Sequence, residues 1–401
     1  MKYAGGRTEP CPVRLPADTR DALRRREGAD LLPMWVADMD FRAAPEIHEA
    51  LMRRAEHGIF GYTVIDDAWY DAYIGWWETR HGFRMEHDWL IFCTGVVPAI
   101  SSMVRKLTTP AEKVLVLTPV YNIFYNSVLN NGRQVLECPL RYENGGYDID
   151  FVSLEAGLAD PQTTLMILCN PHNPIGKLWD RETLARIGAL CHRYGVTVIS
   201  DEIHCDLTAP GQEYVPFASV SEECRQISIT CMAPTKAFNL AGIQTAAVSV
   251  PEPVLRHRVW RGLNTDEVAE PNAFAVTAAV AAFTRGADWL DALRQYVEEN
   301  RRTVDAFLRA HVPSVHLVPS EATYLLWLDC GAESGTDAGE ITAFLRRRTG
   351  LYLSAGAQYG GNGTGFLRMN IACPRSVLED GLHRFEAGMR EYPHRADAAQ
   401  N

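Results

Sequence analysis

The sequence predicts an α/β protein in which helices cover both faces of a mostly parallel sheet. Two observations carry this prediction. The apolar runs between residues 113 and 250 are short and continuous rather than alternating, which is typical of strands buried on both faces. A segment with helical spacing lies among these runs, as expected when helices connect parallel strands. In such a sheet, a ligand site lies at the carboxyl ends of the strands.

The expected elements of this sheet follow one another from residue 113 onward. A helix is predicted at 181–194, because its apolar residues recur at helical spacing and Gly195 offers a C-cap. Strands are predicted at 113–118, 164–169, 196–200, 226–232 and 245–250.

The pattern of predicted strands and helices changes after about residue 286. Residues 289–312 are predicted to form one long amphipathic helix that leads from one domain into another. Short strands and one more helix are predicted beyond it, at 323–328, 337–348 and 365–371. We therefore predict a large domain over residues 46–288 and a small domain made of residues 1–45 and 289–401.

Composition limits the classes of function. The chain has 401 residues, of which 47% are hydrophobic and 22% charged, as in ordinary globular proteins. Its formal net charge is −11 and no basic tract stands out, so neither nucleic acid nor an anionic membrane surface is an expected partner. No apolar run approaches the length of a membrane helix, and the first twenty residues lack the apolar segment of a signal peptide.

The cysteines indicate a reducing compartment. Ten of them are spread from Cys11 to Cys373 without a C-x-x-C pair, and several lie inside apolar runs. We expect reduced, buried thiols and a cytoplasmic location. His204 and Cys205 are adjacent but lack a second pair of ligands, so no metal site is expected.

The segment 233–242 (APTKAFNLAG) places Lys236 just after a predicted strand. A lysine in a cleft at this position has a desolvated amine with a lowered pKa, which imine formation with an aldehyde requires. Thr235 is the hydroxyl residue beside it. A surface lysine at a strand–helix junction would explain this segment alone equally well.

The segment 198–204 (VISDEIH) places Asp201 at the carboxyl end of another predicted strand. A carboxylate there needs a partner, and a protonated pyridine nitrogen would be one. The alternative is a helix N-cap, a common role for aspartate. His204 lies three residues further on, within reach of the same ligand or in a structural role.

Three further segments follow predicted strands or open helices. Asn173 lies in CNPHNPIG (169–176), a loop fixed by prolines that is also explained as a rigid turn. The glycine turn TGVVPA (94–99) opens a predicted helix, and the first N–H groups of a helix suit a phosphate dianion. Tyr121 in LTPVY (117–121) could cover a flat cofactor with its ring, or pack in the core.

In chain order, these five segments resemble the class I and II aminotransferase superfamily of fold-type-I pyridoxal-phosphate (PLP) enzymes. The MalY/PatB-like group of cystathionine β-lyases is the closer resemblance, since LPMWVADMDF (32–41), HGIFGYT (57–63) and GFLRMNIACPR (365–375) also occur. The resemblance spans about residues 31–375. It implies a large domain with a seven-stranded, mostly parallel sheet covered by helices and a smaller α/β domain.

The resemblance implies that PLP is the cofactor and that the strand ends hold it. Lys236 is similar in position to the lysine that forms a Schiff base with PLP and removes the substrate's Cα proton. Asp201 is similar to the partner of the pyridine nitrogen. Asn173 and His204 match the contacts of the phenolic oxygen, and Tyr121 matches the tyrosine that stacks on the ring.

The resemblance also implies a phosphate site shared between subunits. Gly95, Val96 and Val97 would supply phosphate-binding amides, and Thr235 is a further cofactor contact. Tyr62 matches a tyrosine that reaches the phosphate of the other subunit. A homodimer with shared active sites is therefore expected.

The substrate positions come from the last of the matching motifs. Arg368 matches the arginine that binds the α-carboxylate bidentately, and Trp35 and Tyr359 are assigned to the substrate pocket by motif position. Two positions depart from typical aspartate aminotransferases: Gln244 replaces a phosphate-binding arginine, and Ala233 replaces a serine. Both departures occur in the lyase group.

The implied reaction is a carbon–sulfur β-elimination on cystathionine or similar cysteine S-conjugates. Its products are pyruvate, ammonia and a thiol, and its substrate is a small amino acid. The alternatives are transamination, which shares the first steps, and another specialised PLP reaction on an unusual amino acid. A binding or regulatory protein is a less favoured reading, because Lys236, Asp201 and Arg368 are all present.

Overall fold

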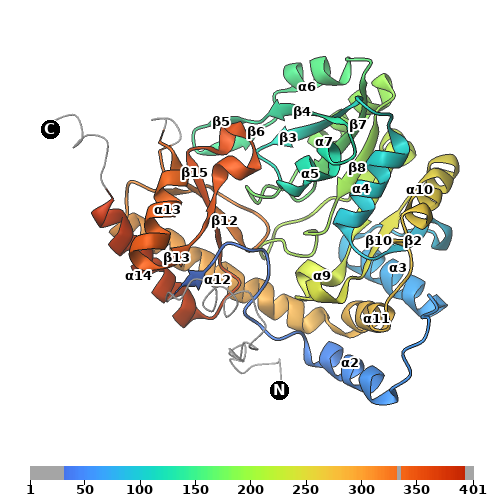
Figure 1. Cartoon of the computed structure of the whole chain (residues 1–401), viewed down its shortest axis with the longest axis horizontal. Helices are drawn as coiled ribbons and strands as arrows, with labels where there is room; N and C mark the ends of the chain where they lie inside the picture. The colour runs from blue at the N-terminus through green and yellow to red at the C-terminus, as the bar shows by residue number, and fades with distance from the viewer. Residues whose placement is uncertain (1–30, 332–335, 393–401) are drawn as a thin grey trace.

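The computed structural model describes residues 31–331 and 336–392, and its largest element is a seven-stranded sheet (Figure 1). The strand β10 is antiparallel to both of its neighbours, whereas the other pairs are parallel. This confirms the predicted mostly parallel sheet. The strands, in spatial order, are β2 (Leu90–Cys93), β10 (Ala246–Ser249), β9 (Ser228–Met232), β8 (Thr197–Asp201), β7 (Thr163–Cys169), β3 (Lys113–Thr118) and β4 (Gln134–Pro139).

Helices cover both faces of this sheet, as the continuous apolar strands require. Along β3, Val114 and Val116 belong to one core, and Leu115 and Leu117 to another. The first core also contains α4 (Val96–Leu107), α5 (Ile123–Leu129) and α10 (Pro253–Thr265), and the second contains α6 (Phe151–Leu158), α7 (Arg181–Tyr194) and α8 (Glu222–Ile227). Polar side chains of these strands are therefore expected at their ends rather than on their faces.

A third group of helices packs beside β2, β9 and β10. These helices are α2 (Pro45–His57), α3 (Asp67–His81) and α11 (Ala275–Arg285). Their aromatic side chains Trp69 and Tyr73 share a core with Phe92 and Met232 of the sheet. The short helix α9 (Pro234–Ala237) follows β9 at the carboxyl edge of the sheet.

The second part of the fold is a four-stranded antiparallel sheet with its own helices. Its strands, in spatial order, are β11 (His316–Leu317), β12 (Leu325–Asp329), β15 (Phe366–Asn370) and β14 (Ser354–Ala355). The helix α12 (Ala287–His311) extends from α11 to this sheet, where α13 (Ala338–Thr349) and α14 (Arg375–Glu391) pack (Figure 1). The N-terminal β1 (Leu32–Pro33) pairs with β13 (Leu351–Tyr352).

The remaining elements are short. A hairpin joins β5 (Arg141–Glu143) to β6 (Gly146–Asp148). The 3₁₀ turns are η1 (His87–Trp89), η2 (Phe217–Ser219), η3 (Ala241–Ile243), η4 (Gly356–Tyr359) and η5 (Gly361–Gly363).

Two predicted strands begin two residues later than expected. The strand expected over 323–328 begins only at Leu325, after Thr323 with its left-handed backbone (φ 69°). The strand expected over 226–232 begins only at Ser228, because residues 226 and 227 close α8. The Ser221 side chain caps that helix by accepting a hydrogen bond from the backbone N–H of Cys224 at 3.2 Å. Residues 226 and 227 therefore belong to the helix that begins at this cap and not to the strand.

Two other expectations concern the thiols and the membrane. Nine cysteines of the described residues are free and buried, as predicted, whereas Cys11 lies outside those residues. Among residues 31–331 and 336–392, no helix combines the length and the apolar character needed to cross a bilayer.

Candidate functional site

The candidate site lies at the carboxyl ends of three neighbouring strands. Asn173 follows β7, Asp201 is the last residue of β8, and Lys236 lies on α9 just after β9. The three strands are adjacent and parallel, so their carboxyl ends meet at one edge of the sheet. Three residues separated in sequence are brought to one place in this way.

Lys236 carries a partly buried amine. Its Nζ donates a hydrogen bond to the backbone carbonyl of Ala37 at 2.6 Å. Burial, and to a lesser extent the Arg368 guanidinium, lower the pKa of Lys236 to about 8, against the opposing charges of Asp38 and Asp201. A substantial fraction of this amine is therefore neutral near physiological pH, which a nucleophilic or basic lysine requires.

Asp201 is a buried carboxyl group that accepts a local hydrogen bond. Its Oδ1 accepts from the backbone N–H of Ile203 at 3.2 Å. Burial raises the pKa of Asp201 to about 7, although this bond and the nearby Lys236 charge lower it. The residues after Asp201 form turns rather than a helix, so it does not act as a helix N-cap. A protonated ring nitrogen would supply the positive partner that this carboxylate needs.

His204 and Asn173 are also buried. Burial, together with the charges of Lys236 and Arg368, lowers the pKa of His204 to about 3, so its imidazole is neutral. The Nδ1 atom of His204 has no hydrogen-bond partner among the described residues. The Oδ1 atom of Asn173 accepts a hydrogen bond from Arg368 Nη1 at 3.2 Å, which leaves its amide nitrogen as a donor.

Arg368 reaches the site from β15 of the second sheet. Its Nη2 donates to the backbone carbonyl of Trp35 at 2.9 Å, and its guanidinium lies 4.8 Å from the ring centroid of Tyr359. Within the described part of the chain, its buried Nε has no hydrogen-bond partner. A buried guanidinium with an available N–H is suited to a carboxylate.

Aromatic side chains border these polar groups. Burial and, to a lesser extent, the Asp201 charge raise the pKa of Tyr121 to about 12 against the lowering effect of Arg368, which places Tyr121 near both residues. Tyr359 is buried and packs edge-on against Trp327. Trp35 stacks on Tyr352 at 5.1 Å between ring centroids.

The first turn of α4 lies at the same edge of the sheet. The strand β2 runs in the same direction as β9, because both are antiparallel to β10, and α4 follows β2. Gly95 is the N-cap of α4, so the backbone N–H groups of Val96 and Val97 belong to its first turn. A Cβ at Gly95 would lie 3.2 Å from Cδ of Pro98. These amides, and the buried Thr235 beside Lys236, are suitable for an anion.

Two predicted positions lie apart from this cluster. Tyr62 is fully exposed in the connection between α2 and α3. Gln244, which replaces the arginine expected in aspartate aminotransferases, is exposed with a left-handed backbone (φ 56°) just before β10. Within this one chain, Tyr62 is not part of the buried group around Lys236.

Sequence reasoning missed a tyrosine and a backbone segment in the site. The carbonyl of Ala37 accepts hydrogen bonds from both Lys236 Nζ and the Tyr324 hydroxyl, the latter at 3.1 Å. Tyr324 is buried, and its ring packs edge-on against His204. The motif at 32–41 belongs to the family resemblance, but nothing in its residue types indicates that a backbone carbonyl holds the lysine.

Two asparagine side chains hold this N-terminal segment in place. Asn239 Nδ2 donates to the carbonyls of Met39 and Phe41 at 3.0 and 2.9 Å. Asn370 Nδ2 donates to the carbonyls of Val36 and Asp38, both at 2.6 Å. The segment therefore joins the residues just after α9, the helix that carries Lys236, to the strand that carries Arg368.

Comparisons with known proteins agree with this architecture. The chain is 46% identical over 360 residues to cystathionine beta-lyase PatB of Bacillus subtilis, covering 90% of this chain and 93% of the relative. The solved structure of cystalysin from Treponema denticola, which contains a pyridoxal 5'-phosphate cofactor, has a TM-score of 0.91 at 29% identity, with coverage of 96% and 99%. A PLP-bound putative aminotransferase from Clostridium difficile 630 has a TM-score of 0.88 at 36% identity, with coverage of 92% and 95%.

These likenesses confirm the predicted fold-type-I architecture and the resemblance to the MalY/PatB-like group. The family model for aminotransferase class I and II matches residues 30–385. The chain belongs to the class I and II aminotransferase family.

Proposed function

We propose that this protein is a PLP-dependent carbon–sulfur β-lyase that acts on cystathionine or similar cysteine S-conjugates. The observation that carries the proposal is the partly buried Lys236 amine, whose pKa is lowered to about 8 and which interacts electrostatically with Arg368 and Asp201. The strong identity to a cystathionine beta-lyase supports the reaction type. The products are pyruvate, ammonia and a thiol.

The residues present fit PLP. A buried carboxyl group at Asp201, an unpaired Nδ1 on the neutral His204 and the reactive amine of Lys236 are a costly arrangement without a polar ligand. Lys236 would hold the aldehyde carbon, Asp201 the ring nitrogen, and Asn173 and His204 the phenolic oxygen. PLP supplies an electron sink for the charge that develops at Cα.

The remaining phosphate and ring contacts are assigned in the same way. Tyr121 would cover the ring with its aromatic face. The amides of Gly95, Val96 and Val97 at the start of α4, together with Thr235, would hold the phosphate.

Each of the other site residues would have a separate role in the elimination. Arg368 would bind the α-carboxylate through its guanidinium N–H groups, with Trp35 and Tyr359 bordering the substrate. The neutral Lys236 amine would remove the Cα proton. The Cβ–S bond would then break, and the departing thiolate would take up a proton to become the free thiol. Water would hydrolyse the remaining three-carbon fragment to pyruvate and ammonia.

Transamination is the second candidate function. The structural likeness to a PLP-bound putative aminotransferase at 36% identity favours it. The same three residues, Lys236, Asp201 and Arg368, could serve either reaction. The substituent on Cβ of the substrate determines which of the two reactions follows. Where Cβ carries no leaving group, Lys236 would give back the proton that it removed, and the amino group would be transferred.

Incubation of the purified holoenzyme with L-cystathionine tests the proposal. We expect pyruvate and free thiol in equal amounts, measured by coupled lactate dehydrogenase and a thiol reagent. Stoichiometric transfer of the amino group to an added 2-oxo acid, without pyruvate, would assign the chain to transamination instead.

The substitution Arg368→Lys should weaken substrate binding. An ammonium group cannot reproduce the planar fork of the guanidinium, and charge-assisted hydrogen bonds contribute about 1.5–3 kcal/mol each, so KM for L-cystathionine should rise by about 10- to 100-fold. The exposed Arg309→Lys on α12 is the matched control. A KM equal to that of the control would contradict the assignment.

The rate of PLP uptake by the apoenzyme should depend on pH through Lys236. Only the neutral amine attacks the aldehyde, so the second-order rate should rise about tenfold per pH unit below a pKa of about 8 and level off above it. Stopped-flow absorbance at several pH values measures this. A midpoint near 10.5, the ordinary lysine value, would show that Lys236 is not desolvated.

We further propose a homodimer in which Tyr62 reaches the phosphate site of the partner subunit. The fully exposed Tyr62 side chain and the exposed apolar neighbours Ile59, Phe60 and Val64 support this, because apolar side chains exposed next to one another are typical of an interaction surface. Tyr62→Phe should weaken PLP binding by about tenfold with little effect on folding, since it removes one hydrogen bond to a charged group. Equilibrium dialysis of PLP measures the effect, and Tyr194→Phe is the control. Light scattering that finds only monomers would contradict the shared site.

The proposed domain division is residues 46–288 against 1–45 and 289–401. The parallel pairing of β1 with β13 supports it, because this pairing ties the N-terminal segment to the C-terminal part of the chain. The buried free cysteines support a cytoplasmic location.

A further inference from the structure

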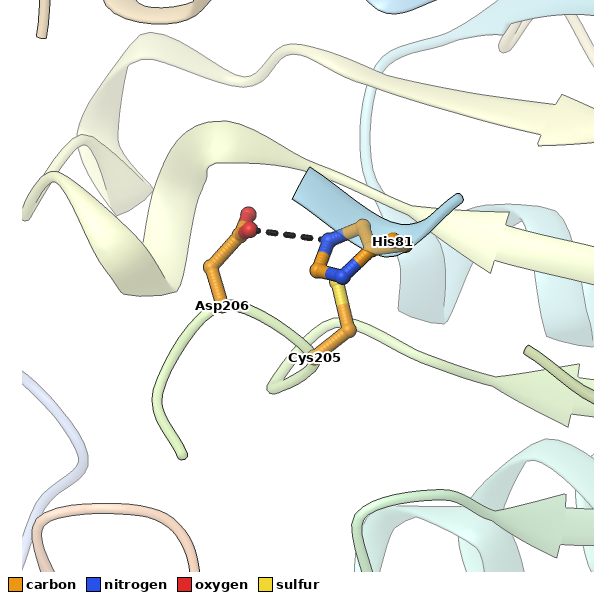
Figure 2. A group of neighbouring side chains, drawn as sticks. All are labelled: His81, Cys205 and Asp206. Atoms are coloured by element: carbon orange, nitrogen blue, oxygen red, sulfur yellow. Dashed lines mark hydrogen bonds and ion pairs between the residues drawn. The ribbon is translucent and has the colours of Figure 1, made fainter. Parts of the chain in front are cut away.

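Three metal-ligating side chains meet outside the proposed PLP site. His81 is the last residue of α3, and Cys205 and Asp206 lie in the turns after β8. One nitrogen, one sulfur and one oxygen of these residues all lie within 4.8 Å of one another. Figure 2 shows the Asp206 carboxylate beside the His81 ring and Cys205 directed to the same ring.

We propose that His81, Cys205 and Asp206 bind a zinc-type divalent metal ion. Imidazole nitrogen, thiolate sulfur and carboxylate oxygen are all common zinc ligands, and three protein ligands leave a fourth tetrahedral position for water. In such a site the ligand atoms lie about 3.5 Å apart, so small side-chain rotations would bring these three into place. Binding would replace the 3.0 Å contact between His81 Nε2 and Asp206 Oδ1 and release the Cys205 thiol proton to solvent.

The surroundings of Asp206 support this assignment. Trp76 Nε1 donates a hydrogen bond to Asp206 Oδ1 at 2.9 Å within the buried interior. Partners of this kind orient ligating carboxylates in metal sites. Trp76 and His81 come from α3, so both the ligand and its supporting group reach the turn after β8 from one helix.

A cavity gives a metal ion access to this cluster. Its volume is about 570 Å³, and His81, Cys205 and Asp206 line it together with Thr208 and Gln212. It is wide enough for the ion to arrive hydrated and for a water molecule to complete the coordination.

Two cationic side chains, Arg80 and Arg294, line the same cavity. The Arg80 guanidinium forms two hydrogen bonds with the Asp291 carboxylate, at 2.9 and 2.7 Å. The Arg294 guanidinium also donates to Asp291 Oδ1, at 3.1 Å, and to the backbone carbonyl of Thr208, at 2.8 Å. Glu213 lines the cavity as well, so two carboxylates besides Asp206 balance the two guanidinium charges.

The metal would connect two parts of the fold that the proposed catalysis uses. The turn that carries Cys205 and Asp206 directly follows Asp201 and His204, and His81 would fasten it to α3. We therefore expect the ion to stabilise the native state, because a ligand bound only by the folded chain raises its apparent stability by mass action.

Zinc binding by the untagged holoenzyme tests the proposal. After dialysis against EDTA, the protein is equilibrated with Zn²⁺ and its metal content is measured by mass spectrometry. We expect one zinc per chain, an increase in Tm, and an affinity at least about tenfold lower in Cys205→Ser and in His81→Asn. Cys138→Ser, at a buried thiol of β4, is the matched control and should bind zinc like the wild type.

X-ray absorption at the zinc edge gives a readout that needs no variant. One sulfur at about 2.3 Å and lighter ligands at about 2.0–2.2 Å are expected for the wild-type protein. A coordination shell without sulfur overturns the proposal, as does a wild-type protein that binds no zinc or variants that retain it at full affinity.

Discussion

The substitution Lys236→Ala should lower kcat/KM for L-cystathionine by about 10⁴-fold or more. General acid–base catalysis alone contributes about 10²–10⁴-fold, and this substitution also removes the amine that would hold PLP covalently. Alanine is small and α9 tolerates it, so the loss should occur without unfolding. Pyruvate formation by the PLP-saturated variant measures the effect.

Two controls separate chemistry from structure in this experiment. Lys106→Ala removes an exposed lysine of α4 and should leave activity unchanged. A small primary amine added to Lys236→Ala should restore part of the rate, because the cavity left by the side chain admits a soluble base. A variant that keeps a tenth of the wild-type activity without added amine would exclude Lys236 as the catalytic base.

The central sheet is predictable because its signals are local. Continuous apolar runs identify β3 at 113–118 with its exact bounds, and Gly195 marks the end of α7. Polar residues directly after such runs fall at one sheet edge, so the positions of Asn173, Asp201 and Lys236 along the chain are enough to predict that they meet. Their chemistry, by contrast, is implied by a resemblance and not by spacing.

The rest of the site depends on contacts between distant segments. Ala37 and Tyr324 meet Lys236 through one backbone carbonyl, and no residue pattern encodes a carbonyl as a lysine partner. The same holds for His81, which reaches Cys205 only because α3 ends beside the turn after β8. Sequence neighbours alone therefore indicate no metal site there.

The substitution Asp201→Asn should lower kcat by about 10²-fold or more while PLP stays attached to Lys236. The amide keeps the shape of the carboxyl group but cannot hold a positive charge on the ring nitrogen, and removal of one preorganised charged partner in a buried site costs about 10²–10³ in rate. KM should change much less, because Arg368, the proposed partner of the substrate carboxylate, lies on a different strand. Steady-state kinetics of the PLP-saturated variant separates the two parameters.

Glu202 provides a matched control for this prediction. It is the next residue along the chain, it is fully buried, and burial raises its pKa to about 7 as it does for Asp201. Its carboxyl group, however, accepts hydrogen bonds from Ser200 Oγ at 2.6 Å and from the backbone N–H of Phe217 at 3.1 Å. Neighbouring residues at a strand end face opposite sides, so Glu202 should point away from the side that Asp201 faces. Glu202→Gln should therefore lower the free energy of unfolding and change kcat much less than Asp201→Asn does. Equal losses of kcat in the two variants would mean that a buried carboxyl group is needed here for packing, and that Asp201 has no special role toward PLP.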